Sequence, residues 1–342
     1  MMIEYVGEKD YQHGSEEKTG VLITNLGTPD APTAKALKPY LKEFLSDQRV
    51  IEIPKFIWQI ILHLIILQIR PRRSAKNYKK IWTDEGSPLL VISNKQVNLV
   101  AEKLKNDFSN TYFLLGMRYG NPSIENALKK FQDKNVRRLL ILPLYPQYCA
   151  ATTASTFDKV SSILKKWRWI PEVRFINHYF EEKLFISAIA DSIIKAQEKK
   201  GKPQKIVFSY HGIPKKYHEE GDPYHCYCLK TSRLVKEYLN LKDEDIITTF
   251  QSRFGNQEWL QPYTDETLKN LPKQGIKDIH IISPGFSSDC LETLEEIEQE
   301  NKDYFIQSGG LSYYYIPCLN YGEKHIEMIS YLIRKHTQGW KV

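Results

Sequence analysis

The sequence predicts an α/β fold made of two similar domains that face a central cleft, each with a parallel sheet covered by helices. Eight short apolar runs rich in β-branched residues alternate with amphipathic or polar stretches of helical length. This alternation is typical of parallel sheets, whose strands are joined by crossover helices. The 342 residues, of which 42% are hydrophobic, suffice for one large domain or two of ordinary size.

The predicted strands are bounded by turn residues. In chain order they are Gly20–Leu26, Tyr112–Met117, Leu139–Leu144, Val173–Asn177, Lys205–Tyr210, Ile246–Phe250, Ile279–Ser283 and Leu311–Ile316. A break near Pro171 predicts an N-terminal domain over residues 19–172 and a C-terminal domain over residues 173–320. Residues 1–18 predict a loose polar arm, and residues 321–342 predict a C-terminal helix that braces the first domain.

The charge pattern limits the classes of ligand. The net charge of +7 favours anionic partners, but lysine and arginine are spread along the chain, so no nucleic-acid partner is predicted. No Gly-x-Gly-x-x-Gly and no Walker-type loop follows a predicted strand, which argues against a dinucleotide or a nucleoside triphosphate. Five scattered cysteines predict reduced thiols, and the lack of an apolar leader before Val21 predicts a cytoplasmic protein.

Two segments present a titratable side chain where a predicted strand leaves its sheet. His211 ends the run that starts at Ile206, and Glu292 follows the run and turn Ile281–Phe286. Open α/β folds bind their ligands at the carboxyl ends of the strands. A neutral imidazole and a carboxylate at such an edge suit proton removal, metal coordination or both. We therefore expect His211 and Glu292 to be catalytic and to contact a metal.

An acidic face extends from Glu292. Glu292, Glu296 and Glu300 are four residues apart, which places them on one face of an α-helix whose first turn favours a carboxylate. Together with Asp289 they form a candidate acidic track for metal entry or proton exit. The alternative is a solvated helix face, which is the commoner role of such glutamates.

The segment Phe56–Arg73 differs from the rest of the chain. Residues 56–69 are apolar nearly all round, and Arg70, Arg72 and Arg73 follow at once. The apolar run is too short to span a bilayer, which needs about 20 residues. It suits a surface helix on an anionic membrane, or an apolar lip over a hydrophobic ligand. A buried core helix or an oligomer contact is the alternative.

Several ordered motifs together resemble the ferrochelatase family. They are Leu22-Ile-Thr-Asn-Leu-Gly-Thr-Pro29, Gly116-Met-Arg118-Tyr119-Gly, Leu142-Pro-Leu-Tyr-Pro-Gln-Tyr148, Ser209-Tyr-His211-Gly-Ile-Pro214, Gly221-Asp-Pro-Tyr224, Gln251-Ser-Arg-Phe-Gly255 with Trp259, and Ser283-Pro-Gly-Phe286 leading to Asp289-Cys-Leu-Glu292. The resemblance runs from about Val21 to about Leu319. It implies two Rossmann-like domains, each a four-stranded parallel sheet flanked by helices, with a porphyrin between them.

The resemblance also implies the reaction and its residues. The family inserts ferrous iron, a substrate, into protoporphyrin IX to form protohaem with loss of two pyrrole protons. His211 and Glu292 match the family's invariant histidine and glutamate. Family positions that line the macrocycle pocket fall on Arg70, Tyr78, Arg118, Tyr119, Trp259 and Phe286. Guanidinium groups pair well with propionates, and aromatic rings stack on the macrocycle.

Departures from the family pattern sharpen these expectations. Cys290 replaces a histidine that many members carry, and a thiol is a poorer proton shuttle at neutral pH. Ala150 stands where some members have a cluster-binding cysteine, and Cys226 and Cys228 alone cannot supply four ligands, so no [2Fe–2S] cluster is predicted. Members of the family that act on coproporphyrin lack such an apolar and basic segment, so the resemblance implies protoporphyrin as the substrate of a chain that carries Phe56–Arg73.

The resemblance further implies where the protein acts. It implies a cytoplasmic protein at the inner face of the membrane and a contact with the enzyme that produces the porphyrin. A sirohydrochlorin or coproporphyrin chelatase of the same fold stays open as an alternative. So does a haem or porphyrin carrier without turnover.

Overall fold

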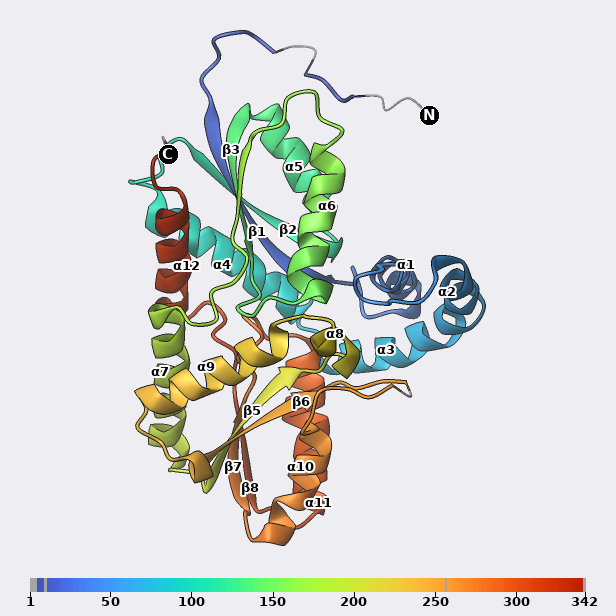
Figure 1. Cartoon of the computed structure of the whole chain (residues 1–342), viewed down its shortest axis with the longest axis vertical. Coiled ribbons are helices and arrows are strands. Elements are labelled where there is room, and N and C mark those ends of the chain that lie inside the picture. Colours follow the sequence, from blue (N-terminus) through green and yellow to red (C-terminus); the bar gives the residue numbers. More distant parts are fainter. Residues whose placement is uncertain (1–4, 9–10, 256, 341–342) are drawn as a thin grey trace. The chain divides into compact units, whose positions relative to one another are not determined.

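The computed structural model describes residues 5–8, 11–255 and 257–340 and forms two compact units (Figure 1). Unit 1 consists of Met1–Leu144, Ala150–Asn177 and Ile326–Val342. Unit 2 consists of Tyr145–Cys149 and His178–His325. The parts of the predicted arm and C-terminal helix at residues 1–4, 9–10 and 341–342 lie outside the described residues.

Unit 1 is built on a parallel sheet that has four strands in the part of the chain described. The strand order is β2-β1-β3-β4, with β1 at Lys18–Thr28, β2 at Thr111–Gly120, β3 at Val136–Pro143 and β4 at Glu172–Phe175. Its helices are α1 (Ala34–Leu45), α2 (Lys55–Ile61), the π-helix η1 (Leu62–Ile66), α3 (Leu67–Ile81), α4 (Pro88–Leu104), α5 (Ile124–Asp133), the π-helix η2 (Ala150–Ala154) and α6 (Ser155–Leu164). Helices α5 and α6 cover one face of the sheet and α4 the other (Figure 1).

Unit 2 repeats the same arrangement. Among the residues described, its parallel sheet has four strands in the order β6-β5-β7-β8, at Ile246–Gln251, Lys205–His211, Asp278–Ile282 and Ser312–Ile316. Its helices are α7 (Lys183–Lys200), α8 (Lys215–Glu219), α9 (Tyr224–Tyr238), α10 (Thr264–Asn270), the π-helix η5 (Glu292–Asn301) and α11 (Lys302–Gln307), with short 3₁₀ turns η3 (Asp243–Asp245) and η4 (Pro272–Gln274). Helix α12 (Glu323–His336) begins in unit 2 and continues in unit 1.

Both sheets therefore confirm the predicted fold class, and the predicted strands agree with the observed ones to within a few residues. In each sheet the second strand lies on one side of the first strand, and the third and fourth strands lie on its other side. The strand order therefore reverses between the first and third strands of each unit. Ligands of open α/β sheets bind outside the carboxyl ends of the strands at such a reversal. In unit 2 this point lies between β5, which ends at His211, and β7, which ends at Ile282.

Each unit has its own apolar core beneath its helices. In unit 1, Leu22, Phe131 and Ile141 pack together with Trp167. Gly20 is required there, because a β-carbon would lie 3.0 Å from the ring of Phe131. The core of unit 2 gathers around buried residues of β5, β7, α10, η5 and α11, namely Val207, Leu268, Ile281, Ile297 and Phe305.

The boundary between the units differs from the expectation. Strand β4 pairs in parallel with β3, so it completes the first sheet, and unit 1 runs on to Asn177. The predicted break at residues 172–173 falls inside this strand because Pro171 precedes it directly. Pro171 starts a strand here, which is a position that proline tolerates, rather than ending a domain.

The N-terminal arm is anchored, not loose, over its described residues. The backbone N–H of Val6 donates to the carbonyl of Lys166 at 2.7 Å. The carboxylate of Glu8 accepts two hydrogen bonds from the guanidinium of Arg137, at 2.9 and 2.7 Å, and that guanidinium lies 3.8 Å from the ring centroid of Trp169. The partners lie far along the chain, so the polar composition of the arm concealed these contacts.

The C-terminal segment packs on unit 1. Arg334 of α12 pairs with Asp107 at 2.7 Å. Arg174 of β4 donates to the carbonyl oxygens of His336 and Gln338 at 2.9 and 2.8 Å. These bonds hold the last described turn of the chain against the edge strand of the first sheet.

Candidate active site

The candidate catalytic histidine lies at the carboxyl edge of the sheet of unit 2. His211 is the last residue of β5 and pairs in register with Gln251, the last residue of β6. Its side chain is half-buried, and Nδ1 lies 2.7 Å from the carbonyl oxygen of Gly212. A carbonyl only accepts, so Nδ1 carries the proton and Nε2 keeps its lone pair. His211 is thus prepared to accept a proton or to bind a metal.

Gly212 lets the chain turn tightly beside this histidine. A β-carbon on Gly212 would lie 2.8 Å from the carbonyl oxygen of Gln251 and 3.2 Å from the ring of Trp259. Trp259, predicted to stack on the macrocycle, is only 4% exposed, and its indole N–H donates to the carbonyl of Phe254 at 2.9 Å. In this structure the tryptophan forms the wall behind Gly212.

Glu292 opens the π-helix η5, where the sequence predicts an α-helix. Its side chain is half-buried, and Phe286, in the turn after β7, is half-buried as well. Widened i→i+5 helices are rare and occur frequently at functional sites. Apolar periodicity did not distinguish the two helix types, because acidic residues dominate this segment. Glu292 therefore lies in the first turn of a π-helix, not of the predicted α-helix.

Asp289 does not extend the acidic track as predicted, because hydrogen bonds occupy both of its carboxylate oxygens. One oxygen accepts from the hydroxyl of Tyr315 at 2.5 Å and from the hydroxyl of Thr293 at 3.1 Å, and the other accepts from the amide of Asn320 at 2.6 Å. Asp289 therefore ties the start of η5 to the segment that follows β8.

Gln251 is a residue of this edge that the sequence analysis did not single out. Its amide oxygen accepts from Ser209 at 2.8 Å, and its amide nitrogen donates to the backbone carbonyl of Glu292 at 2.8 Å. Because Gln251 also pairs in register with His211, it links the strand that carries the histidine to the helix that carries the glutamate. The only sequence feature that pointed to Gln251 was the motif Gln251-Ser-Arg-Phe-Gly255, which begins at this residue.

Glu296 carries a strongly perturbed carboxyl group. Burial raises its pKa to about 7, the charges of Glu292 and Glu300 add to the rise, and hydrogen bonds from Ser252 and Gln251 offset part of it. A carboxyl group with such a pKa exchanges protons near neutral pH. Glu300, by contrast, is exposed and accepts a hydrogen bond from Tyr304 at 2.6 Å.

Cys290 is buried beside Glu292. Burial raises the pKa of its thiol well above the ordinary value, and the charge of Glu292 adds to this. The group is therefore a neutral thiol near pH 7, which is neither a metal-binding thiolate nor a proton shuttle. The absence of a [2Fe–2S] cluster stays a prediction, which iron and sulfide analysis of the purified protein would check.

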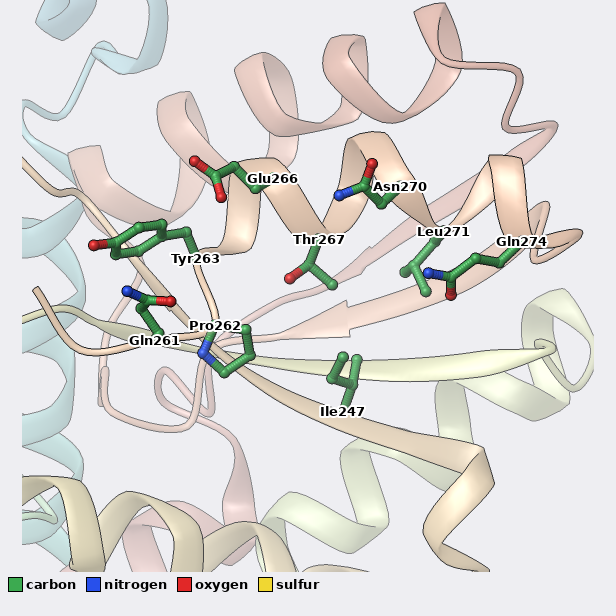
Figure 2. Close-up of a pocket in the computed structure, with 9 residues that line it drawn as sticks. All are labelled: Ile247, Gln261, Pro262, Tyr263, Glu266, Thr267, Asn270, Leu271 and Gln274. Atoms are coloured by element: carbon green, nitrogen blue, oxygen red, sulfur yellow. The ribbon is translucent and has the colours of Figure 1, made fainter.

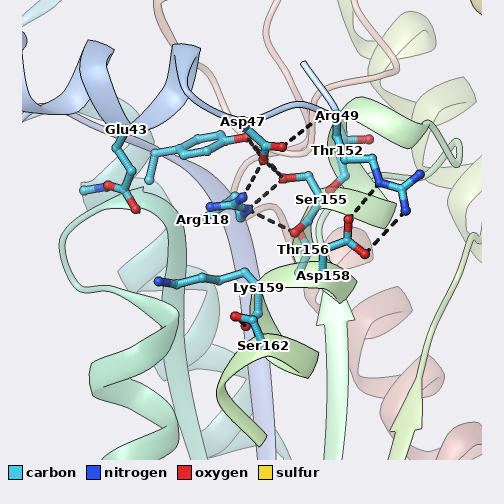
Figure 3. A network of polar contacts seen from close by, with 12 residues as sticks. Glu43, Asp47, Arg49, Arg118, Thr152, Ser155, Thr156, Asp158, Lys159 and Ser162 are labelled. Atoms are coloured by element: carbon cyan, nitrogen blue, oxygen red, sulfur yellow. Dashed lines mark hydrogen bonds and ion pairs between the residues drawn. The ribbon is translucent and has the colours of Figure 1, made fainter. Parts of the chain in front are cut away.

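Unit 1 holds a closed polar network at the corresponding end of its sheet (Figure 3). The carboxylate of Asp47 pairs with the guanidinium of Arg118 and accepts from the hydroxyls of Ser155 and Tyr119 at 2.5 and 2.8 Å. Burial opposes ionisation of Asp47, but the bond from Ser155 and the charge of Arg118 outweigh it and lower its pKa. Asp47 therefore stays a carboxylate.

This network involves two residues expected at the macrocycle. The side chain of Arg118 is 12% exposed and also donates to Ser155 at 2.7 Å, while Tyr119 is fully buried. Burial raises the pKa of the Tyr119 hydroxyl, so it remains a hydrogen-bond donor to Asp47. In this structure Arg118 and Tyr119 stabilise unit 1 and present little surface to a ligand.

Arg70 and Tyr78 lie on α3 with different exposure. Arg70 is exposed, whereas Tyr78 is 7% exposed and its ring centroid lies 6.1 Å from that of Trp82. Tyr78 therefore packs inside unit 1. Of the residues expected at the macrocycle, Arg70 is exposed, Arg118 and Phe286 are half-buried, and Tyr78, Tyr119 and Trp259 are buried.

The apolar segment Phe56–Arg73 forms α2, η1 and the first half of α3. One face of the segment, with Leu62 and Leu67, is buried in unit 1. The opposite face exposes between 47% and 79% of each of six large apolar side chains, namely Phe56, Ile57, Ile60, Leu64, Ile65 and Ile69. Arg72 and Arg73 are also exposed.

Within the described ranges, the helices are all too short or too polar to cross a membrane.

A pocket of about 250 Å³ lies elsewhere in unit 2, between β6 and α10 (Figure 2). Its lining includes Ile247, Pro262, Tyr263, Glu266 and Leu271. None of the predicted site residues lines it. The pocket is therefore distinct from the edge that carries His211 and Glu292.

Comparisons with known proteins agree with the motifs. A family model described as Ferrochelatase matches residues 18–337. The Ferrochelatase of Hydrogenovibrio crunogenus is 55% identical over 99% of this chain and 91% of its own length, and that of Idiomarina loihiensis is 53% identical over 99% and 94%. Among solved structures, SirB from Bacillus subtilis with Fe3+ is similar with a TM-score of 0.53 at 12% identity, over 94% of this chain and 96% of that one. This last similarity concerns the fold.

Proposed function

Since the chain belongs to the ferrochelatase family, it inserts ferrous iron into protoporphyrin IX to form protohaem, and we propose that His211 and Glu292 carry out this step. The observation that supports the assignment is the carboxyl edge of unit 2. There one half-buried imidazole and one half-buried carboxylate stand on elements joined by Gln251.

The chemistry requires a base and a weak metal ligand. Insertion of Fe(II) into the neutral porphyrin forms four iron–nitrogen bonds and releases two protons from the pyrrole N–H groups. In the proposed mechanism Nε2 of His211, whose Nδ1–H is held by the carbonyl of Gly212, accepts the two pyrrole protons in turn and releases the first before it takes the second. The carboxylate of Glu292 contacts the incoming iron, for which oxygen and imidazole ligands are weak enough to exchange.

Glu296 is the proposed next proton carrier. Its pKa of about 7 lets it take a proton at one moment and release it at the next near neutral pH. Glu300 is exposed on the same helix and would pass the proton to solvent. The acidic track is thus proposed as Glu292, Glu296 and Glu300, with Asp289 in a positioning role.

Substrate contacts are proposed for Arg70, which is exposed, and for Phe286, which is half-buried. Arg70 would pair with a propionate through its guanidinium, and Phe286 would lie against the macrocycle. For Tyr78, Tyr119 and Trp259, which are buried, and for Arg118, whose side chain is 12% exposed, a supporting role within their own units is proposed.

The test is an anaerobic assay with Fe(II) and protoporphyrin IX that follows haem by its visible absorption. Wild type should form haem, and Glu292→Gln should bind porphyrin but lose at least about 100-fold in rate, because a neutral amide cannot replace the carboxylate. Glu298→Gln, an exposed residue of the same helix, is the matched control and should retain the rate. Porphyrin binding without turnover in wild type would favour a carrier, and preference for coproporphyrin or sirohydrochlorin would correct the substrate.

We also propose that the exposed apolar face of α2, η1 and α3 binds an anionic membrane surface. Six apolar side chains point away from the core of unit 1, and the exposed arginines 72 and 73 follow them. Apolar burial at the headgroup boundary combined with basic residues is the pattern of interfacial helices. A protein placed in this way could take a hydrophobic porphyrin directly from the bilayer.

Vesicle binding tests the membrane proposal. Replacing Phe56 and Leu64, which are 79% and 71% exposed, with Asp should release the protein from anionic vesicles without unfolding it. Leu311→Asp, 77% exposed on unit 2, is the matched control and should leave binding intact. Equal vesicle binding by wild type, the Phe56/Leu64 double variant and Leu311→Asp would refute the proposal. Loss of the folded state in the double variant would mean that the segment is structural.

A further inference from the structure

A second group of metal-ligating side chains lies outside the candidate active site. His218 at the end of α8 and His225 and Cys226 in the first turn of α9 place their ligand atoms within 4.8 Å of one another. We propose that these three residues bind a borderline divalent metal ion, such as Fe(II), Co(II) or Zn(II), at a site separate from His211 and Glu292. This inference does not depend on the proposed function.

The turn between the two helices holds the three ligands in place. The N–H of Gly221 donates to the carbonyl of His218 at 3.0 Å, and the N–H of Asp222 donates to the carbonyl of Tyr217 at 2.9 Å. The carboxylate of Asp222 then accepts from the N–H of Tyr224 at 2.9 Å, which starts α9. The positive φ of Gly221, 105°, permits this tight connection. The ligands are therefore held near one another by the backbone before any metal binds.

The two imidazoles are oriented by their surroundings. Their ring centroids lie 4.9 Å apart, and the other side of His225 rests against the ring of Phe250 at 5.4 Å. Nδ1 of His218 lies 3.4 Å from the carbonyl oxygen of Asp222, a long contact that favours a proton on Nδ1 and Nε2 as the metal-binding atom. A ligating histidine that donates its other N–H to a carbonyl is the usual arrangement at metal sites.

The ligand set determines the class of metal. Two imidazoles and a thiolate suit borderline ions such as Zn(II), Co(II) and Fe(II), and they exclude Mg(II) and Ca(II), which prefer oxygen ligands. Three protein ligands leave a fourth position of a tetrahedral site for water or another exchangeable ligand. Cys226 is exposed and the two histidines are half-buried, so a metal ion can enter from solvent.

Labelling of Cys226 tests the site on the full-length protein. Cys226 is exposed and the other four cysteines are buried, so a maleimide added to the native protein reports on this thiol. A site nine-tenths occupied leaves about one-tenth of the thiol open to reaction, so Zn(II) near one equivalent should slow labelling about tenfold, and a chelator should restore the rate. Co(II) should produce a thiolate-to-metal absorption band that Cys226→Ser lacks.

Matched variants separate this site from the active site. His218→Asn and His225→Asn should each lose the protection by Zn(II), whereas Glu292→Gln and His63→Asn, an exposed histidine of η1, should retain it. Far-ultraviolet circular dichroism would verify that each variant is folded. Labelling that Zn(II) leaves unchanged in wild type, protection that survives in both histidine variants, or protection lost in Glu292→Gln would each overturn the proposal.

Discussion

The two units have the same strand order, but they place different chemistry at the carboxyl ends of their strands. Unit 2 places His211, Glu292 and Glu296 there, three groups that can exchange protons or bind a metal. Unit 1 places Asp47, Arg118, Ser155 and Tyr119 there, which satisfy one another. One topology therefore carries the candidate active site in one unit and a closed polar network in the other, and the difference comes from the loops and helix starts that follow the strands.

This contrast has an energetic basis. In unit 1 the buried ion pair has hydrogen-bond partners, so it stabilises one arrangement of β2, α6 and the turn that follows α1. In unit 2 the hydrogen bonds to Glu296 only partly offset the loss of hydration that burial imposes on its carboxylate. The pKa of this group is therefore raised. Incomplete compensation makes a group reactive near neutral pH, whereas complete compensation makes it structural.

The largest expected effect comes from removing the proposed base of unit 2. His211→Ala should lower the rate of iron insertion by about 100- to 10,000-fold, because the proton acceptor is lost while the surrounding surface remains. Porphyrin affinity, measured by fluorescence quenching, should stay within about threefold of wild type. His178→Ala, another half-buried histidine of unit 2, is the control. A fully active His211→Ala would remove this residue from the mechanism.

The next effect concerns the closed network of unit 1. Asp47→Ala leaves the guanidinium of Arg118 buried without its partner, which should lower the free energy of unfolding by about 3 to 5 kcal/mol. Asp158→Ala breaks a pair with Arg49 in which both side chains are nearly half exposed, so it should cost less than about 1 kcal/mol. Denaturant unfolding measures both values. Similar losses in the two variants would show that the network is not specially stabilising.

The smallest effect concerns the perturbed carboxyl of unit 2. The pKa of Glu296 is raised from 4.5 to about 7, so its stabilising contribution is fully present below pH 4.5 and is lost as the pH rises to 7. Glu296→Gln mimics the protonated form at every pH. Wild type should therefore lose up to about 3 kcal/mol of unfolding free energy relative to the variant across this range. Parallel pH curves for the two proteins would contradict the raised pKa.

Sequence patterns predicted the strands well, and they placed His211 and Glu292 correctly just after predicted strands, for identifiable reasons. Strands such as β5 and β7 are short apolar runs that end close to a Gly or Pro. Neighbouring residues alone therefore identify the strand ends, and the end of β5 is His211. Glu292 was recognised from the motif that follows β7. These signals lie within a few residues of the groups they identify.

Signals that depend on distant residues were missed. Asp47 and Arg118 are 71 residues apart, and nothing near either one indicates that they pair. Aromatic residues such as Tyr119 and Trp259 give the same pattern whether they stack on a ligand or fill a core. The π-helical form of η5 was also missed, because the residue spacing in this segment fits an ordinary α-helix equally well.

The most direct test of the contrast is a single-turnover measurement of iron insertion on porphyrin-saturated protein, with His211→Ala and Asp47→Asn side by side. Saturation removes differences in porphyrin affinity, and Asn retains hydrogen bonding to Ser155 and Tyr119 while losing the charge. If the chemistry belongs to unit 2, His211→Ala should form almost no haem, and folded Asp47→Asn should insert iron within about threefold of the wild-type rate. Haem formation by His211→Ala together with its loss in folded Asp47→Asn would place the chemistry in unit 1 and contradict this account.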